Sequence, residues 1–181
     1  MTTNTLSRLI HCCMPYERHL RHKLTLRAHD EQVVFIKQKQ ERIEHVWMKA
    51  FLWALYLPEY PDLSVEVKVG AKYKPDVVQM DPRRGRAVFW GEAGHVGASK
   101  VEALVQRKPH THIAIAKWNT ALDPFAAQVE AALADVTRHA PVDLIRFPDD
   151  SAERFIDARG HLALTHDDVP WMRIGNAVPP D

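Results

Sequence analysis

One short segment constrains the fold of this chain more than any other. Residues 111–117 form a nearly continuous apolar run, which is typical of a strand buried on both faces of a sheet. The preceding residues, 99–108, have a helical pattern that opens on Ser99 and Glu102 as a capping box and stops before Pro109. A helix that joins two strands is the connection that parallel strands require, so we expect a parallel strand pair in an α/β fold.

The segments before this crossover give the order of the core elements. Apolar residues recur on one helical face over residues 40–57 and stop at Pro58, which predicts a helix. Three β-like runs follow, at 63–69, 74–80 and 87–92, and turn-forming residues separate them. We expect these runs to form an antiparallel meander. The predicted core order is α-β-β-β-α-β, with a mixed sheet.

Further elements are expected at both ends of this core. Two β-prone runs flank an acidic turn near the N-terminus and predict a hairpin. A helix, a strand and a second hairpin follow the core, and a proline-containing C-terminal segment predicts a flexible tail. The predicted ranges are 24–28 and 33–36 for the first hairpin, 123–139 for the helix, 142–147 for the strand, 157–160 for the second turn and 169–181 for the tail.

Length and charge limit the possible partners. The 181 residues, 46% of them hydrophobic, suit a single domain (1–181) with an ordered core at about 20–168. The net charge of +1 gives no general attraction to nucleic acid or to a membrane. A nucleic-acid partner would therefore need a local basic patch, and the alternative for the same residues is a solvated charged edge of a sheet. The candidates are Arg18, Arg21, His22, Lys23 and Arg27, and Arg83, Arg84 and Arg86.

Cysteine usage and hydropathy predict a cytoplasmic protein. No apolar stretch approaches the roughly 20 residues of a spanning helix. The two cysteines, Cys12 and Cys13, are adjacent, which suits neither a structural disulfide nor a zinc knuckle. The sequence leaves the oligomeric state open.

Two acidic residues, Asp76 and Glu92, stand at equal distance from Arg84 in the turn-rich segment 81–86. A hairpin symmetric about Arg84 places Asp76 opposite Glu92 and Met80 opposite Val88. Opposed carboxylates repel, and Mg²⁺ or Mn²⁺ would compensate, since hard cations accept one or two carboxylates together with water and phosphate. The alternative is that these are ordinary acids at strand ends, because a slip of one residue would separate them.

The residues around Glu92 favour the functional interpretation. Gly91, Ala93 and Gly94 allow a phosphate to approach, and the helix that begins near Ser99 offers an anion site. Lys100 lies in the first turn of that helix, where the helix dipole favours an acid. It could neutralise a phosphate or orient a water molecule.

Three other signals stay open. Glu44 lies at the edge of the apolar stripe of the first long helix, where it is either a surface residue or an acid that reaches a cleft. His110 and His112 have the spacing of two ligands on a strand, but no third zinc ligand is nearby. Trp90 shares a face with the two acids in the expected register, and it either stacks on a base or packs in the core.

The order of elements and three segments resemble a known family. The segments are residues 44–53, residues 88–94 with the helix that carries Lys100, and residues 155–164. With Pro75-Asp76 on the second strand and Glu92 on the third, the chain resembles the PD-(D/E)XK nuclease superfamily and its restriction-endonuclease-like fold. More narrowly, it is similar to the YaeQ-like family of small bacterial proteins. The superfamily's lysine, two positions after the second acid, is replaced by Gly94.

The resemblance implies metal-dependent hydrolysis of phosphodiester bonds in nucleic acid. Asp76, Glu92, the carbonyl of Ala93 and Glu44 would hold Mg²⁺ or Mn²⁺, and Lys100 would take the place of the missing lysine, ahead of Lys74 and Lys117. Substrate contacts are expected from Lys74, Ser99 and His95; His95 would act as an acid or base, and the alternative is that it is a bystander. Two alternatives remain: an inactive nuclease-fold module that binds nucleic acid or protein, and a pocket for a small phosphorylated ligand.

Overall fold

The computed structural model of the chain describes residues 22–175 and has a mixed α/β fold. Its main sheet has six strands in the order β3-β4-β5-β6-β7-β8, and β1 and β2 form a separate two-stranded sheet. The strands are β1 (His22–Ala28), β2 (Glu31–Lys37), β3 (Ser64–Val65), β4 (Val77–Asp81), β5 (Arg86–Ala93), β6 (His112–Trp118), β7 (Val142–Phe147) and β8 (Trp171–Ile174).

The parallel crossover predicted from residues 111–117 is confirmed. β5 and β6 pair in parallel, with Glu92 beside Ile115, and α3 (Ala98–Arg107) connects them. Every β6 residue except the last is buried. α4 (Asp123–Leu133) makes the same kind of connection to β7, whereas β4–β5 and β7–β8 are antiparallel. The sheet is therefore mixed, and the core order α-β-β-β-α-β is confirmed.

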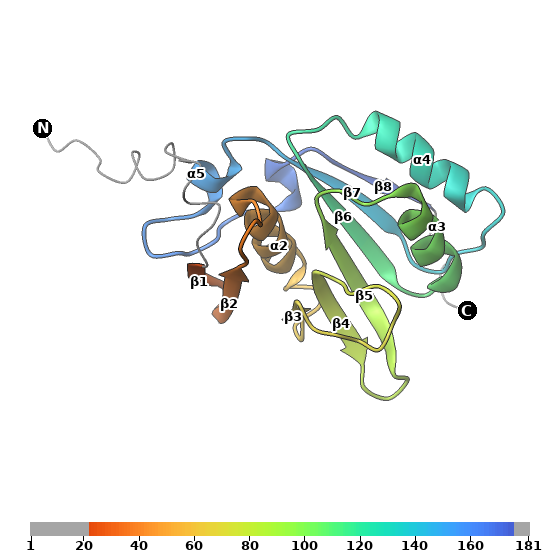
Figure 1. Cartoon of the computed structure of the whole chain (residues 1–181), viewed down its shortest axis with the longest axis horizontal. Coiled ribbons are helices and arrows are strands. Elements are labelled where there is room, and N and C mark those ends of the chain that lie inside the picture. The colour runs from red at the N-terminus through yellow and green to blue at the C-terminus, as the bar shows by residue number, and fades with distance from the viewer. Residues whose placement is uncertain (1–21, 176–181) are drawn as a thin grey trace, which may run out of the picture.

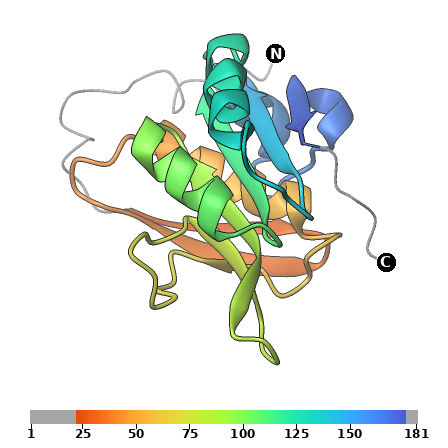
Figure 2. The ribbon, with the colours of Figure 1, turned by 90° about the vertical axis from the view of Figure 1, so that its right-hand side faces the viewer.

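Helices cover both faces of the sheet (Figure 1). α2 (Ile43–Tyr56) and the β1–β2 hairpin pack on one face, and α3 and α4 pack side by side on the other, as Figure 2 shows from the right-hand side of that view. Because strand residues alternate between faces, Phe89 of β5 contributes to the core under α2 and Trp90 to the core under α3.

The late segment of the chain packs against the first strand. It contains α5 (Ser151–Phe155) and a short 3₁₀ helix, η2 (His166–Asp168). The amide of Arg27 donates to the carbonyl of Gly160 at 2.9 Å. The amide of Leu162 donates to the carbonyl of Arg27 at 2.7 Å. The predicted second hairpin is reduced to one bridge, between Ile156 and Leu162.

The first two strands of the predicted meander are shorter than expected. The strand predicted at residues 63–69 spans only Ser64–Val65, because Glu66 has a left-handed backbone (φ 56°) that ends the extended conformation. The following strand begins at Val77 rather than at residue 74. Residues 66–76 therefore form a loop that leads into β4.

Two helix boundaries also differ from the prediction. Gly97 is the N-cap of α3 and no side chain caps this helix, so the predicted Ser99–Glu102 capping box is absent. α4 ends at Leu133 instead of residue 139. The chain turns back after it because the Arg138 guanidinium, 5% exposed, donates to the carbonyls of Val105, Lys108 and Thr111.

The predicted tail contains an ordered strand. Within 169–181, residues Trp171–Ile174 form β8 on the edge of the sheet, and the Arg173 guanidinium binds the buried Asp143 carboxylate at 2.8 and 2.9 Å. Cys12, Cys13, Arg18 and Arg21 lie outside the described residues, as do residues 176–181. None of the helices described is both long and apolar enough to cross a membrane.

Candidate active site

The register of the β4–β5 hairpin ends at the Val77–Gly91 pair, so Asp76 and Glu92 are the next residues on its two sides. Val77 pairs with Gly91 and Val78 with Trp90, as expected for symmetry about Arg84. A bulge between Gln79 and Met80 then shifts the pairing, so Met80 lies opposite Ala87, and the predicted Met80–Val88 pair is wrong. The bulge lies toward the turn, and the amide of Asp76 still donates to the carbonyl of Gly91 at 3.0 Å.

Glu92 is a buried carboxylate that has two donors. It is 3% exposed; the Lys100 ammonium on α3 lies 2.6 Å from Oε2, and the Trp90 indole donates to Oε1 at 2.7 Å. Burial raises the pKa of Glu92, while the hydrogen bonds from Lys100 and Trp90 oppose that rise. Trp90 is fully buried, so it orients Glu92 and is not available to stack on a base.

The side chain of Asp76 is bound by the backbone of Ala93, the last residue of β5. Its Oδ2 atom accepts the amide of Ala93 at 2.8 Å and lies 3.7 Å from Nε2 of His45. Among the described residues no hydrogen bond reaches the other oxygen, Oδ1. Asp76 therefore presents one free carboxylate oxygen.

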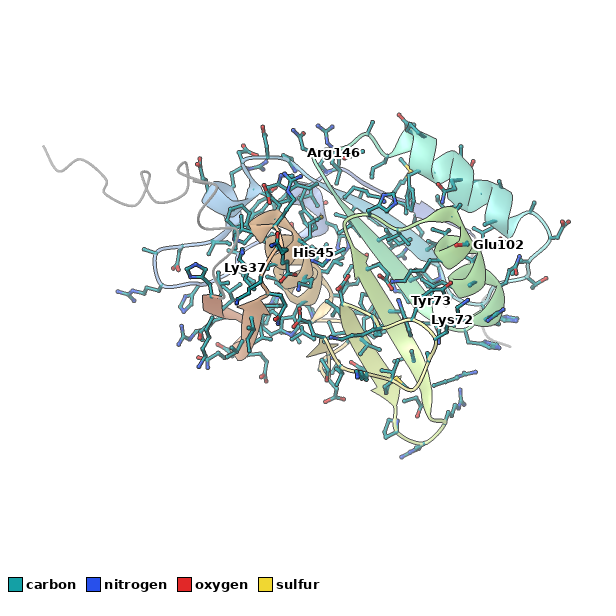
Figure 3. All side chains as sticks on the ribbon, in the orientation of Figure 1. Lys37, His45, Lys72, Tyr73, Glu102 and Arg146 are labelled. Atoms are coloured by element: carbon teal, nitrogen blue, oxygen red, sulfur yellow. The ribbon has the colours of Figure 1, made fainter. Side chains whose placement is uncertain are left out.

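A charged network at the start of α2 reaches Asp76 (Figure 3, where His45 is labelled). Glu41 Oε1 lies 2.7 Å from both His45 Nδ1 and Lys49 Nζ, and Lys49, 1% exposed, also pairs with Glu66. Interaction with Asp76 and then with Glu41 raises the pKa of His45 to about 9. Burial alone would raise the pKa of Glu41, but the hydrogen bonds from His45 and Lys49 lower it to about 2.

This network was missed at the sequence level, although a signal was present. Glu41, His45 and Lys49 have the i, i+4, i+8 spacing that aligns side chains along one face of a helix. Glu66 carries no comparable signal, because it reaches Lys49 from a distant loop.

A cavity of about 780 Å³ lies between α2 and α4, beside the carboxyl ends of β5 and β6. His45 and Gly94 line it and connect it with the Asp76 region. Its other lining residues include Glu41, Arg42, Glu44, Met48, His95, Lys117, Trp118, Thr120, Phe125 and Gln128. Ligands of open α/β sheets commonly bind at the carboxyl ends of the strands.

Lys117 stands beside the position where the superfamily motif has its lysine. Its Nζ atom donates to the carbonyl of Gly94 at 3.0 Å and lies 3.8 Å from the centre of the Phe125 ring. Burial lowers the pKa of Lys117 to about 8. Two lysines thus approach the hairpin end, Lys100 at Glu92 and Lys117 at Gly94.

The other predicted site residues are dispersed. Glu44 pairs with Arg42 at 3.3 Å on the wall of the cavity, exposed His95 also lines it, and Lys74 and Ser99 are exposed. Within residues 22–175, no three side chains of His, Cys, Asp or Glu gather into a group that could hold a metal ion. Among the described residues, Glu44 therefore does not form a preassembled metal site with Asp76 and Glu92.

An aromatic ring and further cations flank Lys100. Tyr73, in the loop before β4, has the ammonium groups of Lys72 and Lys100 at 5.3 and 5.5 Å from its ring centre. Figure 3 shows Lys72 and Tyr73 next to α3. Lys72 and Tyr73 share a small hollow of about 130 Å³ with Arg107 and Lys108. The outer side of the Glu92–Lys100 pair is thus cationic.

The two histidines considered as zinc ligands take part in separate contacts. His110 stacks on His139 with ring centres 4.5 Å apart. His112 is buried, with Nε2 2.7 Å from Asp143 Oδ2 and Nδ1 2.9 Å from the Tyr60 hydroxyl. Asp143 also accepts the Tyr56 hydroxyl at 2.7 Å, and the hydrogen bonds from Arg173 and His112 lower its pKa. This cluster joins β6, β7, β8 and α2.

Comparison with known proteins finds structural relatives only. No family model matches the chain, and no curated protein matches it. The crystal structure of the YaeQ protein from Pseudomonas syringae is similar over 76% of this chain and 75% of that one, with a TM-score of 0.52 and 14% identity. The YaeQ protein from Xanthomonas axonopodis pv. citri has a TM-score of 0.47 and 16% identity, over 69% and 71% of the two chains. The first likeness shows a YaeQ-like fold.

Proposed function

We propose that the protein is a YaeQ-like member of the PD-(D/E)XK superfamily and a metal-dependent phosphodiesterase that cleaves nucleic acid. The observation that carries the proposal is the contact of Lys100 Nζ with Glu92 Oε2 at 2.6 Å, with Asp76, directly before β4, bound to the amide of Ala93 beside Glu92. In the superfamily motif a lysine stands at the position of Gly94. Lys100, which contacts one of the two carboxylates, would take its place. The YaeQ-like fold supports this reading at the level of the backbone.

The carboxylate pair suits Mg²⁺ or Mn²⁺ better than zinc. Hard cations commonly take one or two carboxylates and complete their shell with water and substrate phosphate. No hydrogen bond from residues 22–175 reaches Oδ1 of Asp76, and Glu92 can share Oε2 with an ion if Lys100 moves toward solvent, since the lysine side chain is 24% exposed. Zinc normally requires three or four protein ligands.

In the proposed reaction each residue has a defined task. Asp76 and Glu92 would hold the ion, which lowers the pKa of water and stabilises charge on the phosphoryl group. Lys100, once released from Glu92, would face the phosphate and stabilise its developing negative charge. The amide of Ala93 fixes Asp76, and the indole of Trp90 fixes Glu92.

One observation favours a second candidate, a module without catalysis. Both oxygens of Glu92 already have donors, Trp90 on one and Lys100 on the other. A carboxylate satisfied in this way is stable without a metal ion. In this alternative Lys100 permanently replaces the cation, and the cationic loop around Tyr73 binds nucleic acid or an acidic protein.

Calorimetric titration with Mn²⁺ and Mg²⁺ separates the two candidates. The phosphodiesterase predicts saturable binding that Asp76→Asn and Glu92→Gln both abolish. Lys100→Met should bind metal at least as tightly as the original protein, because a competing cation is removed, but should lose cleavage of labelled DNA and RNA. Glu102→Gln, on the exposed side of α3, is the matched control.

Two results would reject the metal site. One is the absence of any saturable binding, and the other is binding that neither Asp76→Asn nor Glu92→Gln changes. Circular dichroism of each variant must first show that it is folded. Either result would leave the non-catalytic module as the better explanation of the Lys100–Glu92 pair.

A further inference from the structure

The cavity between α2 and α4 contains a buried cation, Lys117, that has no anionic partner among the described residues. Lys117 is 9% exposed, its ammonium donates to one backbone carbonyl, and no carboxylate of the described residues forms an ion pair with it. Lys49 shows the usual arrangement, since it is also buried but contacts both Glu41 and Glu66. Buried lysines are rarely left unpaired. Lys117 donates to the Gly94 carbonyl and lies over the Phe125 ring, and its charge is left for an anion to compensate.

A second unsatisfied donor lines the same cavity. The side-chain nitrogen of Gln128, on α4, is shielded from solvent and has no hydrogen-bond partner in the part of the chain that the structure describes. Buried polar atoms without partners are uncommon and usually have a specific reason. An acceptor group inside the cavity would satisfy both Gln128 and Lys117.

The size and the walls of the cavity indicate a ligand larger than a simple anion. Its volume of about 780 Å³ lies in the range of sites for small organic molecules. Phe125 and Trp118 supply aromatic surface, and Trp118 is braced by Trp47 with ring centres 5.7 Å apart. Glu41 and Glu44 line the α2 side. The cavity thus has donors on one side, carboxylates on the other and aromatic rings in its wall.

We propose that this cavity binds a nucleoside monophosphate unit. The phosphate would contact Lys117 and Gln128, the base would pack on the aromatic wall, and sugar or base donors would reach Glu44. A free nucleotide and the phosphorylated end of a nucleic-acid strand present the same chemistry. The inference goes beyond the proposed function, because binding here requires neither a metal ion nor the Asp76–Glu92 pair.

The test is equilibrium binding in the presence of a metal chelator. The four common nucleoside 5′-monophosphates, their nucleosides and inorganic phosphate are titrated into the protein by calorimetry. At least one monophosphate should bind at a single saturable site, about tenfold or more tighter than its nucleoside and than phosphate alone. Lys117→Met should weaken this binding by about tenfold or more, and Gln128→Leu by a smaller factor.

The matched control is Lys108→Met. Lys108 is also partly buried against an aromatic ring, 4.5 Å from the centre of Trp90, but it lines the other hollow. Its substitution should leave the affinity for monophosphates unchanged. Thermal unfolding followed by circular dichroism establishes that each variant is folded.

Three results would overturn the inference: no saturable binding of any monophosphate, equal affinity for monophosphate and inorganic phosphate, or an affinity that Lys117→Met does not change. Competition by 5′-phosphorylated but not 5′-hydroxyl oligonucleotides would identify the strand end as the source, and competition by free nucleotides alone would identify the free form. Asp76→Asn should leave this binding intact even if it abolishes metal binding, so the two proposals fail separately.

Discussion

Lys100 and Glu92 form an ion pair across the junction of α3 and β5, with Nζ 2.6 Å from Oε2. The carboxylate side chain is 4% exposed and the lysine side chain 24%. The pair therefore joins a buried carboxylate, Glu92, to a partly exposed ammonium group, Lys100. Whether it serves catalysis or replaces a metal ion, it keeps the charge of Glu92 compensated inside the protein.

Lys100→Met should destabilise the fold by roughly 2–4 kcal/mol, because it leaves a buried carboxylate without its cation. Urea denaturation followed by circular dichroism measures this loss. The double variant Lys100→Met/Glu92→Gln should regain most of it. Losses that simply add in the double variant would show that the two side chains are not energetically coupled.

His45 should make stability depend on pH above neutrality. Its pKa is raised from 6.5 to about 9 in the folded protein by Asp76 and then Glu41, so its contribution is complete below pH 6.5 and is lost as pH rises through 9. With the side chain 33% exposed, solvent screening limits the effect to roughly 1–2 kcal/mol. The free energy of unfolding should fall over this range more in the original protein than in His45→Gln.

The difference between the two proteins in the free energy of unfolding, plotted against pH, gives the contribution of His45. Lys117, whose pKa burial lowers to about 8, titrates in the same range but contributes equally to both proteins. Parallel curves between pH 6.5 and 9 would contradict the assigned role of His45.

Gly160→Ala should loosen the contact between the β1–β2 hairpin and the late segment. Gly160 has φ +78°, and an added Cβ would lie 2.7 Å from the carbonyl oxygen of Thr25. We expect a loss of roughly 2–4 kcal/mol from backbone strain and this clash together. Gly85→Ala is the control, since Gly85 has φ +61° but open space around it, and should lose only about 1 kcal/mol. Equal losses of unfolding free energy in the two variants would mean that the backbone moves to relieve the clash with Thr25 at no cost.

Asp143→Ala should be far more damaging than Tyr56→Phe. Asp143 is fully buried and accepts hydrogen bonds from Tyr56, His112 and Arg173. Removing it leaves three donors unpaired and should cost roughly 3–5 kcal/mol, whereas loss of one hydroxyl should cost about 1.5 kcal/mol. Chemical denaturation gives both values. Amide exchange should also show faster exchange in β8 of Asp143→Ala, and similar exchange in both variants would argue against this anchor.

The order of the core elements could be predicted because each depends on local signals. The apolar run at residues 111–117 identified the buried parallel strand, and symmetry about Arg84 predicted the Val77–Gly91 and Val78–Trp90 pairs. The bulge after Gln79 escaped prediction because no residue there requires a special backbone. The prediction of a tail missed β8 because its main support, the Arg173–Asp143 pair, joins distant residues.

The candidate site was predicted only in part for the same reason. The contact of Lys100 with Glu92 spans a short stretch of chain, so its position in the first turn of a helix was informative. His45 and Lys49 depend on Asp76 and Glu66, which come from a loop without regular structure. Lys117 was considered only as a replacement for the missing lysine. Its lack of an anionic partner appears only when all neighbouring side chains are placed.

The contact between the first strand and the late segment also sets an order of events during synthesis. Arg27 donates to the carbonyl of Arg159, 132 residues further along the chain. The hairpin of β1 and β2 can close as soon as it leaves the ribosome, because its pairing is local. Its contact with the late segment must wait until nearly the whole chain has emerged, whereas α2, which shares a core with the hairpin, emerges soon after it. A nascent chain that stalls before Gly160 would therefore leave the edge of β1 at Arg27 without its backbone partners.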